Sequence, residues 1–321
     1  MSVPTPTPTA SRELPEQSPA GASVAPPRPA GRRRREPLPY LLLVPSLVAL
    51  GALFAYPVYL LFRMSFQQLG FGELVRRVTI FTGVDNYTEI LGDPEFWQVV
   101  WRTVAFTAVC VGLTMALGTG IGLLLVKLGT KMTIAVSISL VLAWAIPIVT
   151  ATTLWQWMFD STYGVVNFLL GTPGHDWFAS GLSTFAVIVI IIVWQAVPFV
   201  AFTVQAGVLT IPDEYYEAAR MDGASGWRAF RAVTVPILRP ILFVLAFLST
   251  IWDFKVFTQV WAVRQGGPDG QTVTLPIYIY DMGIASSRYG LAAAGAVVMV
   301  AILGVAMVVY LRHMLRTELE D

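Results

Sequence analysis

The sequence WFASGLSTFAVIVIIIVWQAVPFVAFTVQAGVLTIP, residues 177–212, contains no Asp, Glu, Lys or Arg. A helix of about 20 residues crosses the hydrocarbon core of a membrane, so this run is long enough to span one. A sixth-span candidate, 241–263, is apolar apart from Asp253 and Lys255. Four further runs carry no charge: 40–62, 103–126, 132–159 and 289–311. These runs predict an all-α polytopic membrane protein with six transmembrane helices.

The composition agrees with this fold class and argues against several functions. Of 321 residues, 55% are hydrophobic and 13% are charged, whereas soluble domains carry about 25% charged residues. The net charge of +1 gives no reason to expect a nucleic-acid partner. The single cysteine, Cys110, rules out an intramolecular disulfide, and the two histidines lack the neighbours of a metal site.

No catalytic pattern is visible in the chain. The sequence has no G-x-x-x-x-G-K-[ST] phosphate loop, so we do not expect the chain to hydrolyse ATP by itself. A membrane-embedded enzyme would need a cluster of acid–base, nucleophilic or metal-binding residues, and none can be recognised. We therefore expect a protein that is not an enzyme.

Residues 1–36 differ from the rest of the chain. They are rich in Pro, Ala and Ser, contain few large apolar residues and end in RRRRE. Such a composition predicts a disordered segment. The apolar run that follows is longer than the core of a signal peptide and has no clear cleavage site after it. We interpret it as a retained first span of a membrane domain over 37–321.

The distribution of Lys and Arg predicts the orientation. Six spans place both termini on one side, where the termini and connecting loops together carry fourteen Lys and Arg residues, against six on the other side. Positive residues accumulate on the cytoplasmic side. Both termini and the loop 213–239, between spans four and five, are therefore predicted to be cytoplasmic.

The loop 213–239 has the pattern of two short helices joined by a turn. Pro212 suits the first helical position, and Asp213 places negative charge in the first turn, where the helix dipole favours it. Gly223 can adopt the left-handed conformation that ends a helix. Ser225 is a plausible N-cap for the second helix. The sequence therefore predicts a helix–Gly turn–helix hairpin.

Three interpretations of this hairpin compete. It could be a solvated connector, which is the common case for charged loops of membrane proteins. It could be a DNA-binding helix-turn-helix, although its four acids balance its four basic residues and two spans tether it. It could also be a docking element for a cytoplasmic partner.

A family resemblance favours the third interpretation. The stretch EAARMDGASGWRAFRAVTVPILRP, residues 217–240, resembles the E-A-A-x-x-x-G signature of the permease subunits of ABC importers. In that family the loop forms the coupling helix, which fits a cleft of the ATPase subunit. The residues that match the motif and its tail are Glu217, Ala218, Ala219, Gly223, Phe230, Pro236 and Pro240. The resemblance implies an ATPase-coupling role for Glu217, Ala218, Ala219, Asp222 and Gly223.

Further stretches are similar to the carbohydrate-uptake class, and in particular to the maltose-transporter-like first permease. They are YPVYLLFRMSF (56–66), GVDNYTEILGDPEFWQVVWRTVAFT (83–107), WQWMFDSTYGVVNFLL (155–170), FKVFTQVWAVRQGGPDGQT (254–272) and YGLAAAGAVV (289–298). The family often has an acid where this chain has Thr258, and LTGGGP where it has VRQGGP. This departure leaves the preferred sugar open.

The resemblance implies a fold, partners and a location. The fold would be the type I ABC importer permease fold in a bacterial inner (cytoplasmic) membrane, surrounded by lipid. The partners would be a second homologous permease subunit, two ATPase subunits that bind ATP and Mg, and an extracytoplasmic sugar-binding protein. No cofactor is expected in this chain.

The residues of a substrate pathway are predicted from polarity within the spans. Charges inside a span are expensive and usually functional, which points to Asp253 and Lys255, although both could serve packing alone. On a straight helix, residues two apart point about 200° away from each other, so this pair is not expected to form an ion pair. Sugars stack their C–H faces on aromatic rings, and the further candidates are Trp194, Gln195, Trp252 and Gln259.

Two functions remain open on the sequence alone. The first is the permease subunit of an ATP-driven importer that carries a sugar, such as a disaccharide or oligosaccharide, or a polyol. The second is an ion-coupled secondary transporter of small polar solutes. The latter is expected to place more ionisable groups in the membrane and to have broken helices in paired halves.

Overall fold

The computed structural model describes residues 38–320, and the segment 1–36 lies outside the described residues. The chain divides into two units, one ending at Leu53 and the other beginning at Phe54. The first unit contains α1 (Leu38–Leu50), and all of its side chains from residue 42 to 50 are exposed. A π-helical turn, η1 (Gly51–Ala55), continues this helix towards α2.

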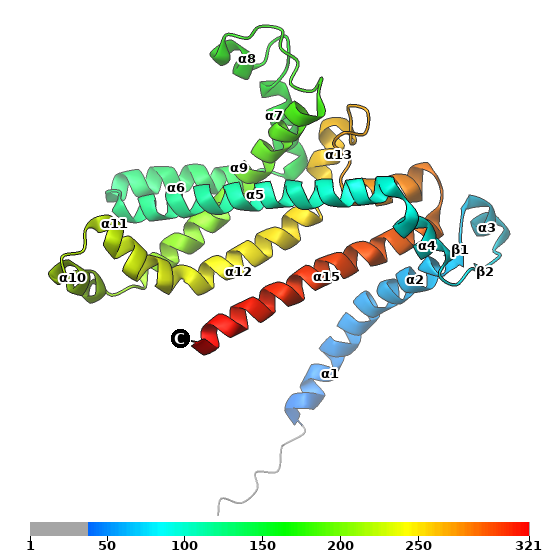
Figure 1. Cartoon of the computed structure of the whole chain (residues 1–321), viewed down its shortest axis with the longest axis horizontal. Helices are drawn as coiled ribbons and strands as arrows, with labels where there is room; N and C mark the ends of the chain where they lie inside the picture. The colour runs from blue at the N-terminus through cyan, green and yellow to red at the C-terminus, as the bar shows by residue number, and fades with distance from the viewer. Residues whose placement is uncertain (1–37, 321) are drawn as a thin grey trace, which may run out of the picture. The chain divides into compact units, whose positions relative to one another are not determined.

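The second unit is built from long helices (Figure 1). They are α5 (Pro94–Lys127), α9 (Gly181–Leu209), α12 (Val235–Phe254) and α15 (Tyr289–Glu320). The shorter helices are α2 (Tyr56–Ser65), α3 (Phe71–Arg76), α4 (Asp85–Gly92), α6 (Thr130–Ala145), α7 (Ile148–Met158), α8 (Val165–Leu170), α10 (Asp213–Met221), α11 (Gly226–Ala229), α13 (Thr258–Arg264) and α14 (Leu275–Tyr280). Two π-helical turns, η2 (Phe230–Thr234) and η3 (Asp281–Ala285), and a two-stranded antiparallel ribbon, β1 (Gln67–Gln68) with β2 (Ile80–Phe81), complete the described elements.

The predicted fold class is confirmed. Within residues 38–320, five helices are long and apolar enough to cross a membrane: Leu42–Ser65, Pro94–Lys127, Gly181–Leu209, Gly226–Phe254 and Tyr289–Arg312. The bent pair α6 and α7 gives a sixth candidate if the two helices count as one span. In Figure 1 the hairpin of α10 and α11 lies at the end of α5 that carries Lys127, and α4 lies at the other end.

The helices α5 and α9 pack closely along much of their length. Gly118 and Gly122 of α5 are buried at this contact. A Cβ at Gly118 would lie 2.6 Å from the Val200 side chain, and a Cβ at Gly122 would lie 2.6 Å from the carbonyl oxygen of Ala201. The contact therefore requires glycine at both positions, as small-residue interfaces between membrane helices do.

The charge-free run 132–159 is not one straight helix. Its two halves, α6 and α7, are bent by 104° at Ile146 and Pro147. Proline has no N–H to donate and disfavours a helical conformation at the preceding residue. Ile146 is accordingly extended, and Pro147 is the N-cap of α7.

The run 241–263 is also broken, which corrects the expectation that Asp253 and Lys255 lie on one straight helix inside a span. The helix α12 ends at Phe254, Lys255 is its C-cap, and α13 starts only at Thr258. Unwound backbone at membrane depth is tolerated where it lines a cavity, and a cavity adjoins this break. The expected 200° separation on a straight helix therefore does not apply.

We predict that Gly122→Ala lowers the thermal unfolding midpoint of the detergent-solubilised protein. The new methyl group must push α5 and α9 apart, and overpacking of this kind costs about 1–3 kcal/mol. The matched control is Gly120→Ala on the same helix, where no atom lies within 4 Å of the added Cβ. Alanine is the better helix former by up to about 1 kcal/mol, so the control should be neutral or stabilising. Equal midpoints for the two variants would contradict the close-packing role.

Candidate functional site

Both helix breaks line one cavity, here called the inter-break cavity. It has a volume of about 740 Å³. One wall is the junction of α6 and α7, a second is the middle of α9, and a third is the chain from the end of α12 into α13. The residues that line it are Trp144–Ile148, Ile192, Gln195, Ala196, Phe199, Trp252, Asp253 and Lys255–Gln259.

Five of the six predicted pathway residues meet in this cavity: Gln195, Trp252, Asp253, Lys255 and Gln259. Trp194 does not. It lines a separate, largely apolar cavity of about 620 Å³ between α5, α6 and α9, and its ring centroid lies 5.7 Å from that of Trp155. Adjacent residues of a helix point about 100° apart, so Trp194 and Gln195 face different cavities.

The inter-break cavity contains two buried hydrogen-bond acceptors, one on Gln195 and one on Asp253. Gln195 donates its Nε2 to the carbonyl oxygen of Ile146 at 3.3 Å, which satisfies one backbone group at the first break. Gln195 Oε1 and Asp253 Oδ2 are buried, and neither has a hydrogen-bond partner among residues 38–320. Such groups cost about 1–3 kcal/mol when left unpaired. Both oxygens are shielded from solvent, so a ligand with hydroxyl or amide donors would be stabilised here once a local movement brought it within reach of them.

The two charges of this cavity do not pair, as the sequence predicted. In the part of the chain that the structure describes, the one ion pair joins Arg288 to Glu89. Asp253 is buried, whereas Lys255 is exposed. The exposed Lys255 ammonium is therefore accessible to a ligand or to water, whereas Asp253 is largely shielded from both.

Aromatic rings form the other part of the lining. The Trp252 side chain is 44% exposed, and its ring meets that of Phe199 edge to face with the centroids 5.2 Å apart. Trp144 and Phe257 also line the cavity, and sequence reasoning missed these two residues and Phe199. Trp144 and Phe257 lie beside the breaks at 146–147 and 255–257, and Phe199 lines the same cavity from α9. The charge-free runs did not reveal these breaks.

The chain beyond the second break is held by distant residues. Gln156 of α7 donates its Nε2 to the carbonyl oxygens of Ala262 and Val263 at 3.1 and 3.0 Å. Arg102 of α5 donates to the carbonyl oxygen of Gly270 at 2.9 Å. Gln271 accepts a hydrogen bond from the first N–H of α9. This wall of the cavity is therefore fixed to α5, α7 and α9.

The predicted hairpin is present, and its turn has the expected geometry. Gly223 has φ +76° and follows α10. Its N–H bonds to the carbonyl oxygen of Arg220 at 3.0 Å, and the N–H of Ala224 bonds to that of Ala219 at 2.9 Å. These two bonds form a Schellman motif, which normally requires glycine at the left-handed position.

The boundaries of the hairpin differ slightly from the prediction. Pro212 is the N-cap of α10 and not its first helical residue. Ser225 is the N-cap of α11, as predicted, but its side chain makes no capping bond. From Gly226 the helix continues through η2 into α12, so Pro236 lies in the first turn of α12 and Pro240 inside it.

The predicted coupling residues lie on an accessible surface. Glu217, Ala218, Asp222 and Gly223 are exposed, and Ala219 is half-buried. The α10 helix is tied to the following helix by a hydrogen bond of 2.9 Å between the hydroxyls of Tyr216 and Thr234. The hairpin therefore presents a short, rigid helix whose small residues permit close approach of another surface.

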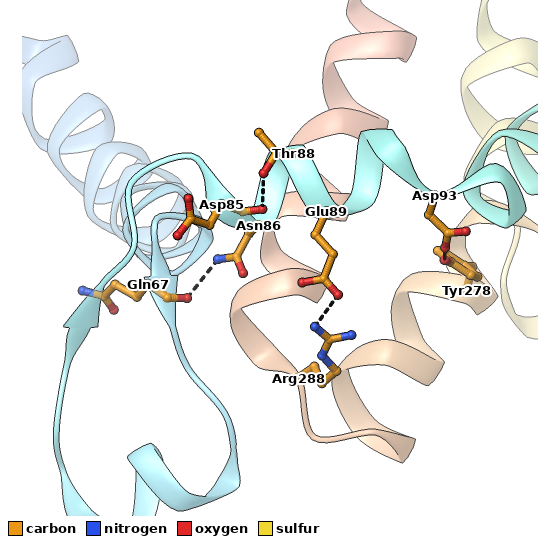
Figure 2. Close-up of polar contacts among 8 residues, drawn as sticks. All are labelled: Gln67, Asp85, Asn86, Thr88, Glu89, Asp93, Tyr278 and Arg288. Atoms are coloured by element: carbon orange, nitrogen blue, oxygen red, sulfur yellow. Dashed lines mark hydrogen bonds and ion pairs between the residues drawn. The ribbon is translucent and has the colours of Figure 1, made fainter.

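A polar network joins segments far apart in the sequence at the other end of α5 (Figure 2). Asn86 of α4 donates to the carbonyl oxygen of Gln67 at 3.0 Å, and Glu89 pairs with Arg288 at 2.5 Å. Tyr278 donates its hydroxyl to Asp93, and burial together with this bond raises the pKa of the Tyr278 hydroxyl. The network connects α4 and its C-cap Asp93 to α14 and to the residue that precedes α15, and it borders a recess of about 330 Å³.

The comparison with protein families decides what the chain is. Residues 108–316 match the model of the inner membrane component of binding-protein-dependent transport systems. The match begins in α5 and includes both helix breaks and the hairpin. The chain belongs to this family. The resemblance read from residues 217–240 is thereby confirmed.

Relatives of this permease are named for sugar uptake. The chain is 46% identical to the diacetylchitobiose uptake system permease protein DasB of Streptomyces coelicolor, over 88% of each chain. It is 36% identical to the sulfoquinovosyl glycerol transport system permease protein SmoG of Agrobacterium fabrum, over 88% of this chain and 91% of that protein. It is 32% identical to the trehalose/maltose transport system permease protein MalF of Thermococcus litoralis, over 79% and 88%.

Solved structures support the fold. A chain in the crystal structure of a bacterial ABC transporter involved in the import of the acidic polysaccharide alginate superposes with a TM-score of 0.76, at 20% sequence identity, over 87% of this chain and 95% of that chain. A chain of the MetNI methionine ABC transporter in an inward-facing conformation gives a TM-score of 0.52 at 21% identity, over 69% of this chain and 97% of that one. The permease therefore has the fold of ABC importer membrane subunits.

Proposed function

We propose that this chain is the transmembrane permease subunit of an ATP-driven importer, which passes a sugar from an extracytoplasmic binding protein into the cytoplasm. The observation that carries the proposal is the inter-break cavity of a chain that belongs to the permease family. Two spans unwind beside this cavity, and its lining combines aromatic rings with buried acceptors.

The substrate we propose is a disaccharide or oligosaccharide. The relatives' names supply the sugar class, since they include diacetylchitobiose and trehalose/maltose systems. The cavity volume of about 740 Å³ lies within the range of small-molecule sites, about 300–1,000 Å³. Asp253 Oδ2 and Gln195 Oε1 would accept hydrogen bonds from hydroxyl or amide groups, and Trp252 would stack on a sugar face.

The remaining partners follow from the same proposal. A second, homologous permease would complete the pathway, and two ATPase subunits would bind ATP and Mg and supply the hydrolysis that this chain does not. The hairpin of α10 and α11 would dock on one ATPase subunit, with Glu217 offering its carboxylate to a basic residue and Ala218 and Ala219 allowing close contact.

The orientation we propose places both termini and the hairpin in the cytoplasm of a bacterial cell. It rests on the excess of Lys and Arg on that side, since positive residues accumulate on the cytoplasmic side. In this orientation the network of Figure 2 and its recess face outward, towards the binding protein.

The ion-coupled transporter is the weaker alternative. Two broken helices beside a polar cavity are found in such transporters, and the structure has two breaks. Family membership nevertheless favours the ABC importer, because the matched region includes both breaks and the hairpin.

We predict that Asp253→Leu and Trp252→Leu impair sugar uptake in cells while the complex with the ATPase still purifies. The first variant removes a charged hydrogen-bond acceptor of similar size, a loss of about 1.5–3 kcal/mol, which corresponds to roughly a tenfold or greater loss of affinity. The matched control is Trp194→Leu, since Trp194 lines the other cavity. Normal uptake by both cavity variants would leave the end of α12 with a packing role only.

We also predict the result of labelling with a membrane-impermeant maleimide in intact cells. In a Cys110→Ala background, Thr172→Cys and Ser286→Cys should be labelled from outside, whereas Ser225→Cys in the hairpin should be labelled only after lysis. All three positions are exposed in the structure, so access is decided by the side of the membrane. Labelling of Ser225→Cys alone in intact cells would invert the proposed orientation.

A further inference from the structure

A further cavity, here called the span-end cavity, lies where two charge-free runs reach their ends. Lys127 directly follows the charge-free run 103–126, and Asp213 directly follows the charge-free run 177–212. Both residues line the cavity, which has a volume of about 910 Å³. Charge is excluded from hydrocarbon, so the first charged residues after such runs lie towards the lipid headgroups. These residues place the cavity near the height of the headgroups, separate from the inter-break cavity.

The charges that line the span-end cavity favour a single negative charge. Lys127 and Arg220 are its cations, and Asp213 is its one acid. The Arg220 Nε donates to the carbonyl oxygen of Tyr216 at 3.1 Å, and the two outer nitrogens of the guanidinium take no part in this bond. Within the described residues, neither Lys127 nor Arg220 belongs to an ion pair. The charged residues of the lining therefore sum to +1, and neither cation is neutralised by an ion pair with an acid.

The rest of the lining is apolar and includes an exposed tryptophan. Leu123 and Val126 belong to the last turns of α5. Trp227 is 68% exposed and stacks on Phe230 with the ring centroids 5.3 Å apart. Tryptophan is enriched at the boundary between hydrocarbon and headgroups. An occupant of this cavity therefore meets cations beside an apolar wall.

We propose that the span-end cavity is a binding site for an anionic glycerophospholipid with one net negative charge, such as phosphatidylglycerol. The phosphate lies between Lys127 and Arg220, and a headgroup hydroxyl donates to Asp213. One acyl chain follows Leu123 and Val126 beside the Trp227 ring. Basic pockets between spans at the cytoplasmic surface are the kind of site that binds acidic lipids.

Occupancy of this site would affect the hairpin. Residues of α10 and α11 line the cavity together with the end of α5, so a bound lipid bridges the hairpin and the membrane domain. The lipid would restrain the hairpin on the side of α10 that carries Tyr216 and Arg220, with Ala218 on the opposite side of the helix.

The test uses quenching of Trp227 fluorescence by brominated acyl chains, which act at short range. The full chain is reconstituted in phosphatidylcholine vesicles that contain dibrominated phosphatidylglycerol, phosphatidylethanolamine or phosphatidylcholine at equal fractions. The Trp227→Phe variant is measured in parallel, and the difference between the two proteins isolates the signal of Trp227. We expect the Trp227 fluorescence to be quenched at a lower fraction of brominated phosphatidylglycerol than of either of the other two brominated lipids. Inorganic phosphate at 10 mM should not reverse this quenching.

Charge variants identify the site. Lys127→Gln and Arg220→Gln should each raise the half-quenching fraction of phosphatidylglycerol about fivefold, whereas Lys127→Arg should leave it unchanged. The matched controls are Lys131→Gln and Arg228→Gln, which remove nearby cations that do not line the cavity. Equal quenching by all three lipids, preference for phosphatidylethanolamine, reversal by phosphate, or an equal effect of the control variants would each overturn the proposal.

Discussion

The close approach of α5 and α9 is the constraint on which the functional parts of this permease depend. It exists because Gly118 and Gly122 bring no side chain to a contact where a Cβ would lie 2.6 Å from the neighbouring helix. At one end of this pair, Arg102 holds the chain that follows α13. At the other end, Lys127 and Leu209 stand next to the hairpin. In its middle, α9 turns Gln195 towards the inter-break cavity.

The two broken spans form a polar cavity beside α9, one helix of this packed pair. A straight helix has no free backbone groups in its interior, whereas the breaks at Ile146–Pro147 and after Phe254 leave carbonyl and N–H groups that need partners. Gln195 supplies one of these partners by donating to Ile146. Unwound backbone, a buried carboxylate and aromatic rings are thus collected in one place, where a hydroxyl-rich ligand could satisfy them.

Composition and motif were sufficient to predict the fold class and the hairpin. Five charge-free runs and the run 241–263, which is apolar apart from Asp253 and Lys255, located the candidate spans, because hydrocarbon excludes charge. The position of Gly223 predicted the left-handed turn, since few other residues adopt positive φ without strain. These are local rules, and they do not depend on which helices are neighbours.

The breaks could not be predicted from the same rules. Pro147 stands at a bend of 104°, whereas Pro198 and Pro240 lie inside continuous helices, so proline alone does not locate a break. The helix α12 ends at Phe254 without a proline or glycine nearby. Trp194 and Gln195 were equally plausible pathway residues, and only the rotation of α9 within the packed unit separates their cavities. In each case tertiary contacts determine where a helix ends or which cavity a side chain faces.

The central claim is that the hairpin transmits ATP hydrolysis to a sugar pathway in the membrane. The most direct test is ATP hydrolysis by the reconstituted complex, with and without sugar-loaded binding protein, for Gly223→Val and the matched variant Gly226→Val. Neither glycine has an atom within 4 Å of an added Cβ, but only Gly223 has a positive φ, where a side chain costs about 1–2 kcal/mol. The account predicts that Gly223→Val loses the stimulation by loaded binding protein while Gly226→Val keeps it. Full stimulation in Gly223→Val would contradict the coupling role.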